Sequence, residues 1–200
     1  MDRTLLIILF AQLGTTEFLQ AVAEFSKTYP DVRIKITSGG HEQLYQALKD
    51  NKIDFVFSDL RITPSNLYMN DFLISSDYKV IISQGTFAAD KEKVESTELE
   101  DLPCILIVGA NEAAAEEEYY RDILGVKSEF VIAQTYDEAA MIAASRQGYL
   151  LINNRTSKNI DTQALQTLTW LNNHEEIKQK YYAFWKADNS GLYIERLPIC

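Results

Sequence analysis

Residues 18–36 read FLQAVAEFSKTYPDVRIKI, and this stretch decides the fold class. Within it, apolar side chains recur at three- and four-residue spacing: Phe18, Leu19, Val22 and Phe25. That spacing predicts a helix over 16–28 whose apolar face lies on a sheet. The helix is expected to stop at Tyr29, because Pro30 disfavours the α conformation in the residue before it. The apolar run 32–36 then predicts a strand.

The same alternation continues on both sides of this stretch. Apolar runs at 5–10 and 53–57 predict two more strands, and 41–50 predicts a second helix. The first sixty residues therefore have the order β-α-β-α-β. Strands this apolar, joined through helices, are typical of a parallel sheet covered on both faces.

A second α/β unit is expected after a polar segment at 61–71, where Thr-Pro-Ser-Asn interrupts any regular element. In this second unit we predict strands at 78–83, 104–108, 130–133 and 149–152 and helices at 97–102, 113–124 and 136–147. The aromatic composition of 165–171 and 176–186 suits strands, and we expect this part of the chain to be a return segment that pairs with one of the two lobes. The expected division is lobe I at 1–72 plus 170–200 and lobe II at 73–169.

Helix ends in the second unit carry recognisable capping patterns. Thr135 and Glu138 form a capping box, and Gly148 is expected to take the left-handed conformation that ends the same helix. Asn111 is expected to cap the helix at 113–124. The acids within 113–118 are expected to form a solvated helix face near a helix N-terminus.

Charge and composition exclude several classes of protein. The 200 residues carry 19 Lys and Arg against 29 Asp and Glu, and a net charge of -10 disfavours direct binding to nucleic acid. The two cysteines, Cys104 and Cys200, make no disulfide framework, which favours a reducing cytoplasm. The apolar run 5–11 is a poor signal peptide, and no stretch reaches the ~18 apolar residues of a membrane span.

Motifs for catalysis, metals and cofactors are missing from the sequence. His41 and His174 lie at no metal-ligand spacing from each other or from cysteines. The sequence contains no G-x-S-x-G elbow, no phosphate-binding loop and no G-x-G-x-x-G after the first strand. We therefore expect no catalytic residue, no metal and no cofactor.

The candidate binding residues follow the carboxyl ends of the predicted parallel strands, where open α/β sheets bind ligands. They are Gln12, Gly14, Thr15, Thr16, Ser38, Gly39, His41, Asn111, Thr135 and Tyr136. Each loop suits a small polar ligand held by backbone amides and hydroxyls, although the same residue types also serve as plain helix caps. Asp59 and Arg61 either line the site or pair on the surface.

The stretch 18–36, followed by Ser38-Gly39-Gly40 and then 44–59, resembles the effector-binding domain of LysR-type transcriptional regulators. The resemblance implies an α/β fold like that of type 2 periplasmic binding proteins, with two Rossmann-like lobes joined by two crossing strands. It places these crossings near 71–76 and 165–171. It also implies that an effector binds in the cleft between the lobes, against the candidate residues named above.

The resemblance further implies a non-enzymatic, cytoplasmic sensor domain that forms a homodimer or a higher homo-oligomer. Its ligand would be a small polar metabolite, with an anion as one candidate, and binding would be passed to a DNA-binding domain. Full-length members carry an N-terminal helix-turn-helix domain that does not precede Thr4 here, so DNA would be bound only through that missing domain. A transport protein of the same fold and, ranked lowest, a small enzyme on this scaffold are the alternatives.

Overall fold

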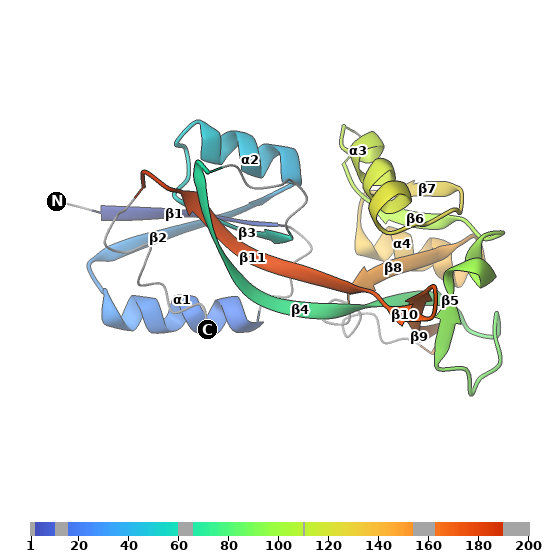
Figure 1. Ribbon diagram of the computed structural model, residues 1–200. Helices are drawn as coiled ribbons and strands as arrows, with labels where there is room; N and C mark the ends of the chain where they lie inside the picture. Colours follow the sequence, from blue (N-terminus) through green and yellow to red (C-terminus); the bar gives the residue numbers. More distant parts are fainter. Residues whose placement is uncertain (1–2, 11–15, 60–65, 110, 154–162, 190–200) are drawn as a thin grey trace. The chain divides into compact units, whose positions relative to one another are not determined.

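The computed structural model describes residues 3–10, 16–59, 66–109, 111–153 and 163–189 (Figure 1). The chain divides into two compact units. Unit 1 comprises Met1–Ser75 and Lys180–Cys200, and unit 2 comprises Ser76–Gln179. Each unit is an α/β structure with its own core.

Unit 1 is built on a sheet with the strand order β2-β1-β3-β11. Its elements are β1 (Arg3–Phe10), α1 (Thr16–Thr28), β2 (Val32–Gly39), α2 (His41–Lys49), β3 (Phe55–Asp59) and the part of β11 (Lys178–Lys186) that pairs with β3. β1 pairs in parallel with β2 and β3, and β11 runs antiparallel to β3. The predicted β-α-β-α-β order is therefore confirmed.

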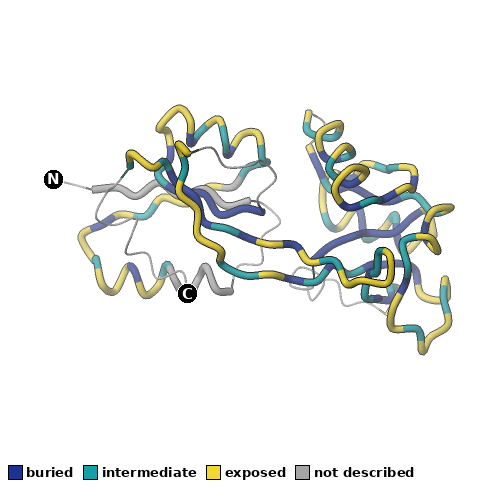
Figure 2. The backbone as a smooth tube through the Cα atoms, in the orientation of Figure 1, coloured by how far each residue is buried: buried dark blue, intermediate teal, exposed yellow. Residues whose placement is uncertain are grey.

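The core of unit 1 comes from the apolar faces predicted for its helices. Phe25 of α1 is fully buried against Phe55 and Phe57 of β3, and Trp185 of β11 stacks on Phe55 with ring centroids 5.3 Å apart. Leu44 and Leu48 of α2 are buried in a separate cluster. Each such side chain contributes about 1.5–3 kcal/mol by leaving water. Figure 2 shows β3 as a continuous buried segment in the middle of this sheet.

Unit 2 has the strand order β4-β8-β6-β7, with β9 paired to β4, β5 and β10. Its strands are β4 (Tyr68–Ser83), β5 (Lys93–Glu95), β6 (Cys104–Ile107), β7 (Phe130–Ala133), β8 (Tyr149–Asn153), β9 (Leu165–Asn172) and β10 (Glu175–Glu176). Its helices are the 3-10 turn Ser96–Leu99, α3 (Ala113–Glu118) with the π-helical turn Tyr119–Ile123, and α4 (Tyr136–Ala144). β6 pairs in parallel with both β7 and β8.

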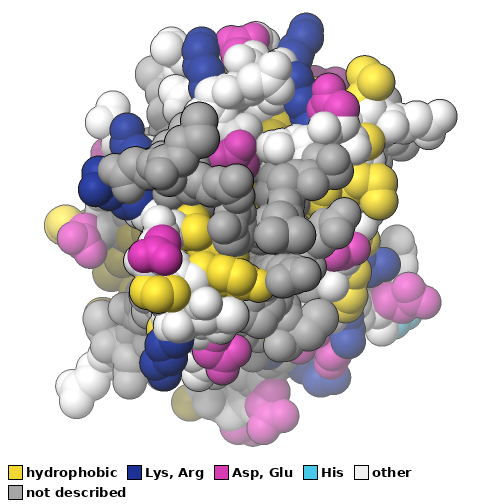
Figure 3. Space-filling model, turned by 90° about the vertical axis from the view of Figure 1, so that its left-hand side faces the viewer, with side chains coloured by type: hydrophobic (Ala, Val, Ile, Leu, Met, Phe, Trp, Pro, Cys, Tyr) yellow, Lys and Arg dark blue, Asp and Glu magenta, His cyan; other side chains and the backbone are white. Residues whose placement is uncertain are grey.

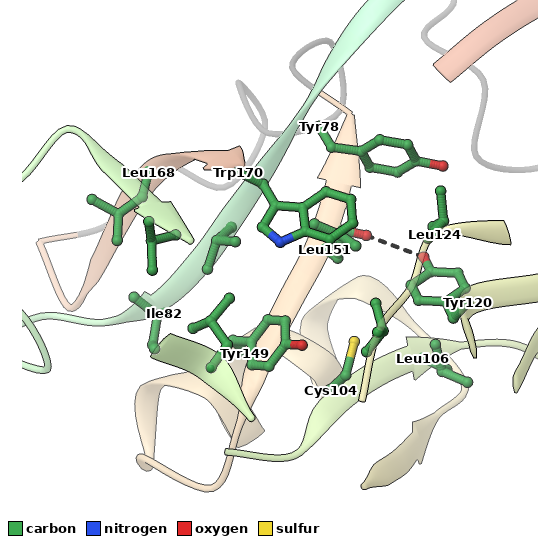
Figure 4. Packing of buried hydrophobic residues seen from close by; sticks show 14 of the residues in the cluster. Tyr78, Ile82, Cys104, Leu106, Tyr120, Leu124, Tyr149, Leu151, Leu168 and Trp170 are labelled. Carbon is green, nitrogen blue, oxygen red and sulfur yellow. Dashed lines mark hydrogen bonds between the residues drawn. The ribbon is translucent and has the colours of Figure 1, made fainter. Parts of the chain in front are cut away.

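Aromatic side chains fill the core of unit 2 (Figure 4). The Trp170 ring meets Tyr78 edge to face with centroids 5.8 Å apart, a geometry favoured by the charge distribution of aromatic rings. The buried hydroxyls of Tyr120 and Tyr149 have partners, since burying them alone would cost free energy. The Tyr120 hydroxyl donates to the Leu151 carbonyl oxygen at 3.2 Å.

Two strands, β4 and β11, belong partly to each unit and so carry the chain across. The first crossing lies where the sequence places it, at 71–76 within β4. The second was expected at 165–171, and this expectation is wrong because β9 stays within unit 2, where it pairs with β4 and β5. The aromatic segment of β11 makes the crossing instead and pairs with β3 at residues 181–184.

Three predictions about helix ends in unit 2 also need correction. The helix expected at 113–124 ends as an α-helix at Glu118 and continues as a π turn, in which the Leu124 amide donates to the Tyr119 carbonyl at 3.2 Å. Asn111 is not a cap, because the N-cap of α3 is Glu112. After α4 the left-handed residue is Arg146, with φ of 63°, and not Gly148.

Candidate functional site

In unit 1, the carboxyl ends of β2 and β3 bring together the start of α2 and a buried polar pair. β2 ends at Gly39, and α2 begins at His41 after one residue. The His41 Nδ1 atom lies 3.1 Å from the Ser58 hydroxyl, and its Nε2 atom lies 3.1 Å from Asp59 Oδ1. Ser58 and Asp59 are only 1% and 2% exposed. The imidazole therefore joins the start of α2 to the end of β3.

The contacts among His41, Ser58 and Asp59 include a hydroxyl, an imidazole and a carboxylate, which are the groups of a nucleophilic triad. The Ser58 hydroxyl also donates to Asp59 Oδ1 at 3.3 Å, so all three side chains contact one another. A nucleophile must be reachable by its substrate, and the Ser58 side chain is almost completely buried. This cluster is therefore suited to positioning the start of α2 rather than to attacking a carbonyl.

The amino end of α2 can receive a ligand group. Its N-cap residue is Gly40, which has no side chain and gives the helix no side-chain cap. First-turn amides that lack a side-chain cap can donate hydrogen bonds to an anionic or carbonyl oxygen. Ser38 and Gly39 end β2 just before this turn, and only the backbone of Ser38 is described.

In unit 2, the corresponding helix start belongs to α4. The Thr135 hydroxyl accepts a hydrogen bond from the Glu138 amide at 3.2 Å, and the Glu138 carboxylate accepts one from the Gln134 amide at 2.7 Å. The Thr135 cap predicted here is therefore confirmed, but the full capping box is not, because the Glu138 carboxylate accepts from the Gln134 amide and not from the Thr135 amide. Thr135 is exposed, so its hydroxyl can still meet a ligand while capping the helix. Tyr136 is half-buried and packs against the core cluster beneath α4.

Two buried polar side chains lie close to this end of unit 2, and sequence analysis missed them both. Glu116 of α3 is 7% exposed, and Asn153 at the end of β8 is 4% exposed. The solvated face predicted for 113–118 is therefore wrong at Glu116, because a six-residue helix against β6 turns one of its acids inward. Asn111 is exposed in the turn before α3, where its amide is open to a ligand.

The remaining predicted residues cannot be placed to the same extent. Gln12, Gly14 and Thr15 lie outside the described residues, as does Arg61. Thr16 is the first residue of α1, and only its backbone is described. Ser58 was not among the expected residues, although it could have been found from the sequence as a polar residue directly after the apolar strand run 53–57 and next to Asp59.

Within the described ranges, no group of three or more His, Cys, Asp and Glu side chains is arranged to bind a metal ion. No helix among these residues has both the length and the apolar composition needed to cross a membrane.

A family model described as LysR substrate binding domain matches residues 2–192. The chain belongs to this family. Its members' substrate-binding domain is the ligand-sensing part of a transcriptional regulator, and the present chain is therefore a LysR-type ligand-sensing regulatory domain. The transport and enzyme alternatives are not favoured by this match. No curated protein sequence matches the chain.

Solved structures of LysR regulators share the fold. The effector-binding domain of a BenM variant has a TM-score of 0.81 and 16% identity, over 98% of this chain and 91% of that chain. The BenM effector-binding domain with its effector benzoate has a TM-score of 0.75 and 16% identity, over 96% and 87%. The regulatory domain of MetR from N. meningitidis has a TM-score of 0.74 and 14% identity, over 97% and 89%. The type 2 periplasmic-binding-protein-like fold is thereby confirmed.

The present chain matches the sensor part of longer regulators. It covers 65% of full-length BenM, with a TM-score of 0.79 and 17% identity.

Proposed function

We propose that this LysR domain binds a small polar metabolite, with an anion favoured, at the turns that follow its parallel strands. The observation that carries the proposal is the start of α2, where a glycine N-cap leaves the first turn without a side-chain cap beside His41. An anionic oxygen would receive hydrogen bonds from the first-turn amides and would be stabilised by the helix dipole. The proposed contacts are Gln12, Gly14, Thr15, Thr16, Ser38, Gly39, His41, Asn111, Thr135 and Tyr136.

Asp59 bears on the choice of ligand charge. Its carboxylate lies 3.1 Å from His41 Nε2 and offsets any positive charge on the imidazole. Attraction of an anion would therefore come mainly from the backbone amides and not from a free imidazolium. This arrangement favours a ligand with a single carboxylate or a polarised carbonyl over one with several charges.

The domain is proposed to act without catalysis. The buried position of Ser58 supports this, because the one hydroxyl-imidazole-carboxylate cluster among the described residues cannot be approached by a substrate. Ligand binding would instead act by differential affinity for two arrangements of the protein, which is how a sensor shifts an equilibrium. The signal would pass to an N-terminal helix-turn-helix domain, and the protein would work in the cytoplasm.

The sensor is proposed to form a homodimer. β2 and β7 end the strand order of the sheet, and edge strands are prone to pair with other chains. Apolar side chains are exposed on and beside these edges: Ile36 is 45% exposed, Ile132 is 36% and Met141 on α4 is 67%. On the face shown in Figure 3, the described basic and acidic side chains are interspersed. DNA binding is proposed for a separate domain.

Isothermal titration against organic acids, amino acids and nucleotides tests the ligand proposal directly. For the best binder, His41→Gln should weaken affinity at least tenfold, because it removes the imidazole at the start of α2. Thr135→Ala should also weaken binding, while Thr135→Ser, which keeps the hydroxyl, should not. Lys49→Ala at the far end of α2 is the matched control. If all four variants bound the ligand like the parent, the pocket assignment would be wrong.

The coding sequence upstream tests the regulatory proposal, and sedimentation tests the dimer. A helix-turn-helix segment directly before this domain is expected, whereas an export signal there would support a transport protein.

Analytical ultracentrifugation should show a dimer that Met141→Glu converts to a monomer, because a charge in an apolar interface is costly. A monomeric parent protein would overturn the dimer proposal.

A further inference from the structure

Unit 2 contains a hollow that the proposed effector site does not use. Its volume is about 260 Å³, and it is lined by Ile82, Gly85, Thr86, Leu102, Arg146 and Gly148. This volume lies just below the range of ~300–1,000 Å³ found for pockets that hold drug-sized ligands. The hollow therefore suits a small molecule.

The hollow lies at the opposite end of the strands from the proposed effector contacts. Leu102 lies two residues before the start of β6, and Gly148 directly precedes β8; the two strands begin side by side, with Cys104 paired to Tyr149. The proposed effector contacts Asn111 and Thr135 instead follow the carboxyl ends of β6 and β7. A ligand in the hollow would thus occupy a second site that is separate from the first.

The backbone of Arg146 is held in a costly conformation beside this hollow. Its φ is 63°, in the left-handed region where glycine is preferred after a helix. Its amide donates to the Ala143 carbonyl at 3.0 Å, which closes the last turn of α4 in that conformation. Strained residues of this kind gather at functional sites. The strain is therefore a reason to look for a function of the arginine.

The guanidinium of Arg146 is a cation without a counterion in a largely apolar wall. Among the described residues, its side chain makes no ion pair and no hydrogen bond, although Glu98 and Glu176 each pair with a lysine elsewhere in unit 2. The guanidinium lies beside Gly85, since a Cβ added there would be 3.8 Å from Arg146 Nη2. Arginine binds carboxylates through two parallel hydrogen bonds.

We propose that this hollow binds a small monocarboxylate with a short apolar body. The carboxylate would pair with Arg146, and the apolar body would lie against Ile82 and Leu102. Thr86, whose hydroxyl donates to the Ser83 carbonyl at 2.9 Å, fixes the turn that forms one wall. Gly148 also lines the hollow. This position has no room for a side chain, because a Cβ there would lie 2.5 Å from the Pro103 carbonyl oxygen.

Hexanoate is the probe, and 1-hexanol is its neutral match. For a ligand of this size we expect a Kd on the order of 1 mM, measured by ¹⁵N chemical-shift titration of the whole domain. The amide resonances of Gly85, Thr86 and Gly148 should shift and saturate with hexanoate but not with hexanol. If hexanoate at about 20 mM, roughly twenty times the expected Kd, shifted none of these resonances, the proposal would be overturned. Equal shifts with hexanol would overturn it as well.

Variants separate the charge of Arg146 from its effect on folding. Arg146→Gln should weaken hexanoate binding at least tenfold, Arg146→Lys less, and Arg121→Gln, an exposed arginine over the Phe130 ring in the same unit, not at all. Arg146→Gly should raise the thermal midpoint by relieving the backbone while also abolishing binding. If Arg146→Gln bound hexanoate like the parent protein, or if Arg146→Gly bound it normally, the site would be refuted.

This test is independent of the proposed function. Effector binding is monitored at Gly39, His41 and Thr135, and those resonances are not expected to shift with hexanoate at the hollow. If hexanoate does not bind in the hollow, the proposal of the effector site is unaffected. If hexanoate shifts both sets of resonances, it also binds at the effector site.

Discussion

Replacing Gly148 with alanine should destabilise unit 2, although the change adds only one methyl group. A Cβ at this position would lie 2.5 Å from the Pro103 carbonyl oxygen and 3.1 Å from Ile105 Cγ1. The carbonyl cannot move away freely, because it accepts a hydrogen bond from the Tyr149 amide at 2.9 Å where β8 begins. The clash is therefore with backbone that β6 and β8 hold in place.

The size of the effect follows from these two contacts. Overpacking in a well-filled site costs about 1–3 kcal/mol, and loss of the Tyr149 hydrogen bond adds about 1 kcal/mol. We expect Gly148→Ala to lower the free energy of unfolding by about 3 kcal/mol. With a denaturant slope of about 2 kcal/mol/M, the urea midpoint should fall by roughly 1.5 M.

Gly109→Ala is the matched control for this experiment. A Cβ at Gly109 would meet only Glu112 Oε2, at 3.9 Å, which is an ordinary contact. Its free energy of unfolding should change by no more than about 0.5 kcal/mol. Urea unfolding followed by tryptophan fluorescence, which reports on buried Trp170, measures both variants. Equal midpoints for the two variants would refute the reasoning.

Three further predictions concern unit 2. Thr135→Ala should lower the free energy of unfolding by about 1 kcal/mol through loss of the α4 cap, with Thr135→Ser close to the parent in thermal unfolding. Burial raises the pKa of Cys104 to about 12, so in a Cys200→Ser background the thiol should react with Ellman's reagent at pH 8 only as urea unfolds the protein; prompt labelling of the native protein would contradict this. The hydrogen bond from Lys91 holds the pKa of Glu98 below its unfolded value of 4.5, so its stabilisation is present above pH 4.5 and is lost as the pH falls further; Glu98→Gln, a partly exposed site, should cost less than about 1 kcal/mol at pH 7 and nothing at pH 2 in urea titrations.

The sequence predicted the elements of both units where burial follows a regular period. The helix 16–28 and the strand at 53–57 have one apolar face or a continuous apolar run, and the structure places their core residues accordingly. The first half of β4 has no such pattern, since Met69 and Phe72 are 52% and 53% exposed. Its strand start at Tyr68 could not be predicted, because tertiary pairing and not burial period holds it in place.

The candidate site shows the same division. Turn residues such as Thr135 were predictable, because capping chemistry is local and depends on neighbours in sequence. The contact of His41 with Asp59 joins residues 18 positions apart, and the burial of Glu116 depends on how a short helix packs against β6. No periodic pattern in the sequence predicts either feature. The left-handed conformation of Arg146 was also missed. Glycine is the residue that most often takes this conformation, and Gly148 lies only two residues later.

We propose that the effector binds at the strand-end turns named above. A ¹⁵N chemical-shift titration with the best ligand from the screen tests this claim most directly. We expect the amides of Gly39, Gly40 and His41 in unit 1 and of Thr135 and Tyr136 in unit 2 to shift and to saturate with a single Kd. A ligand that shifts the amides of only one unit, at any concentration, would contradict it.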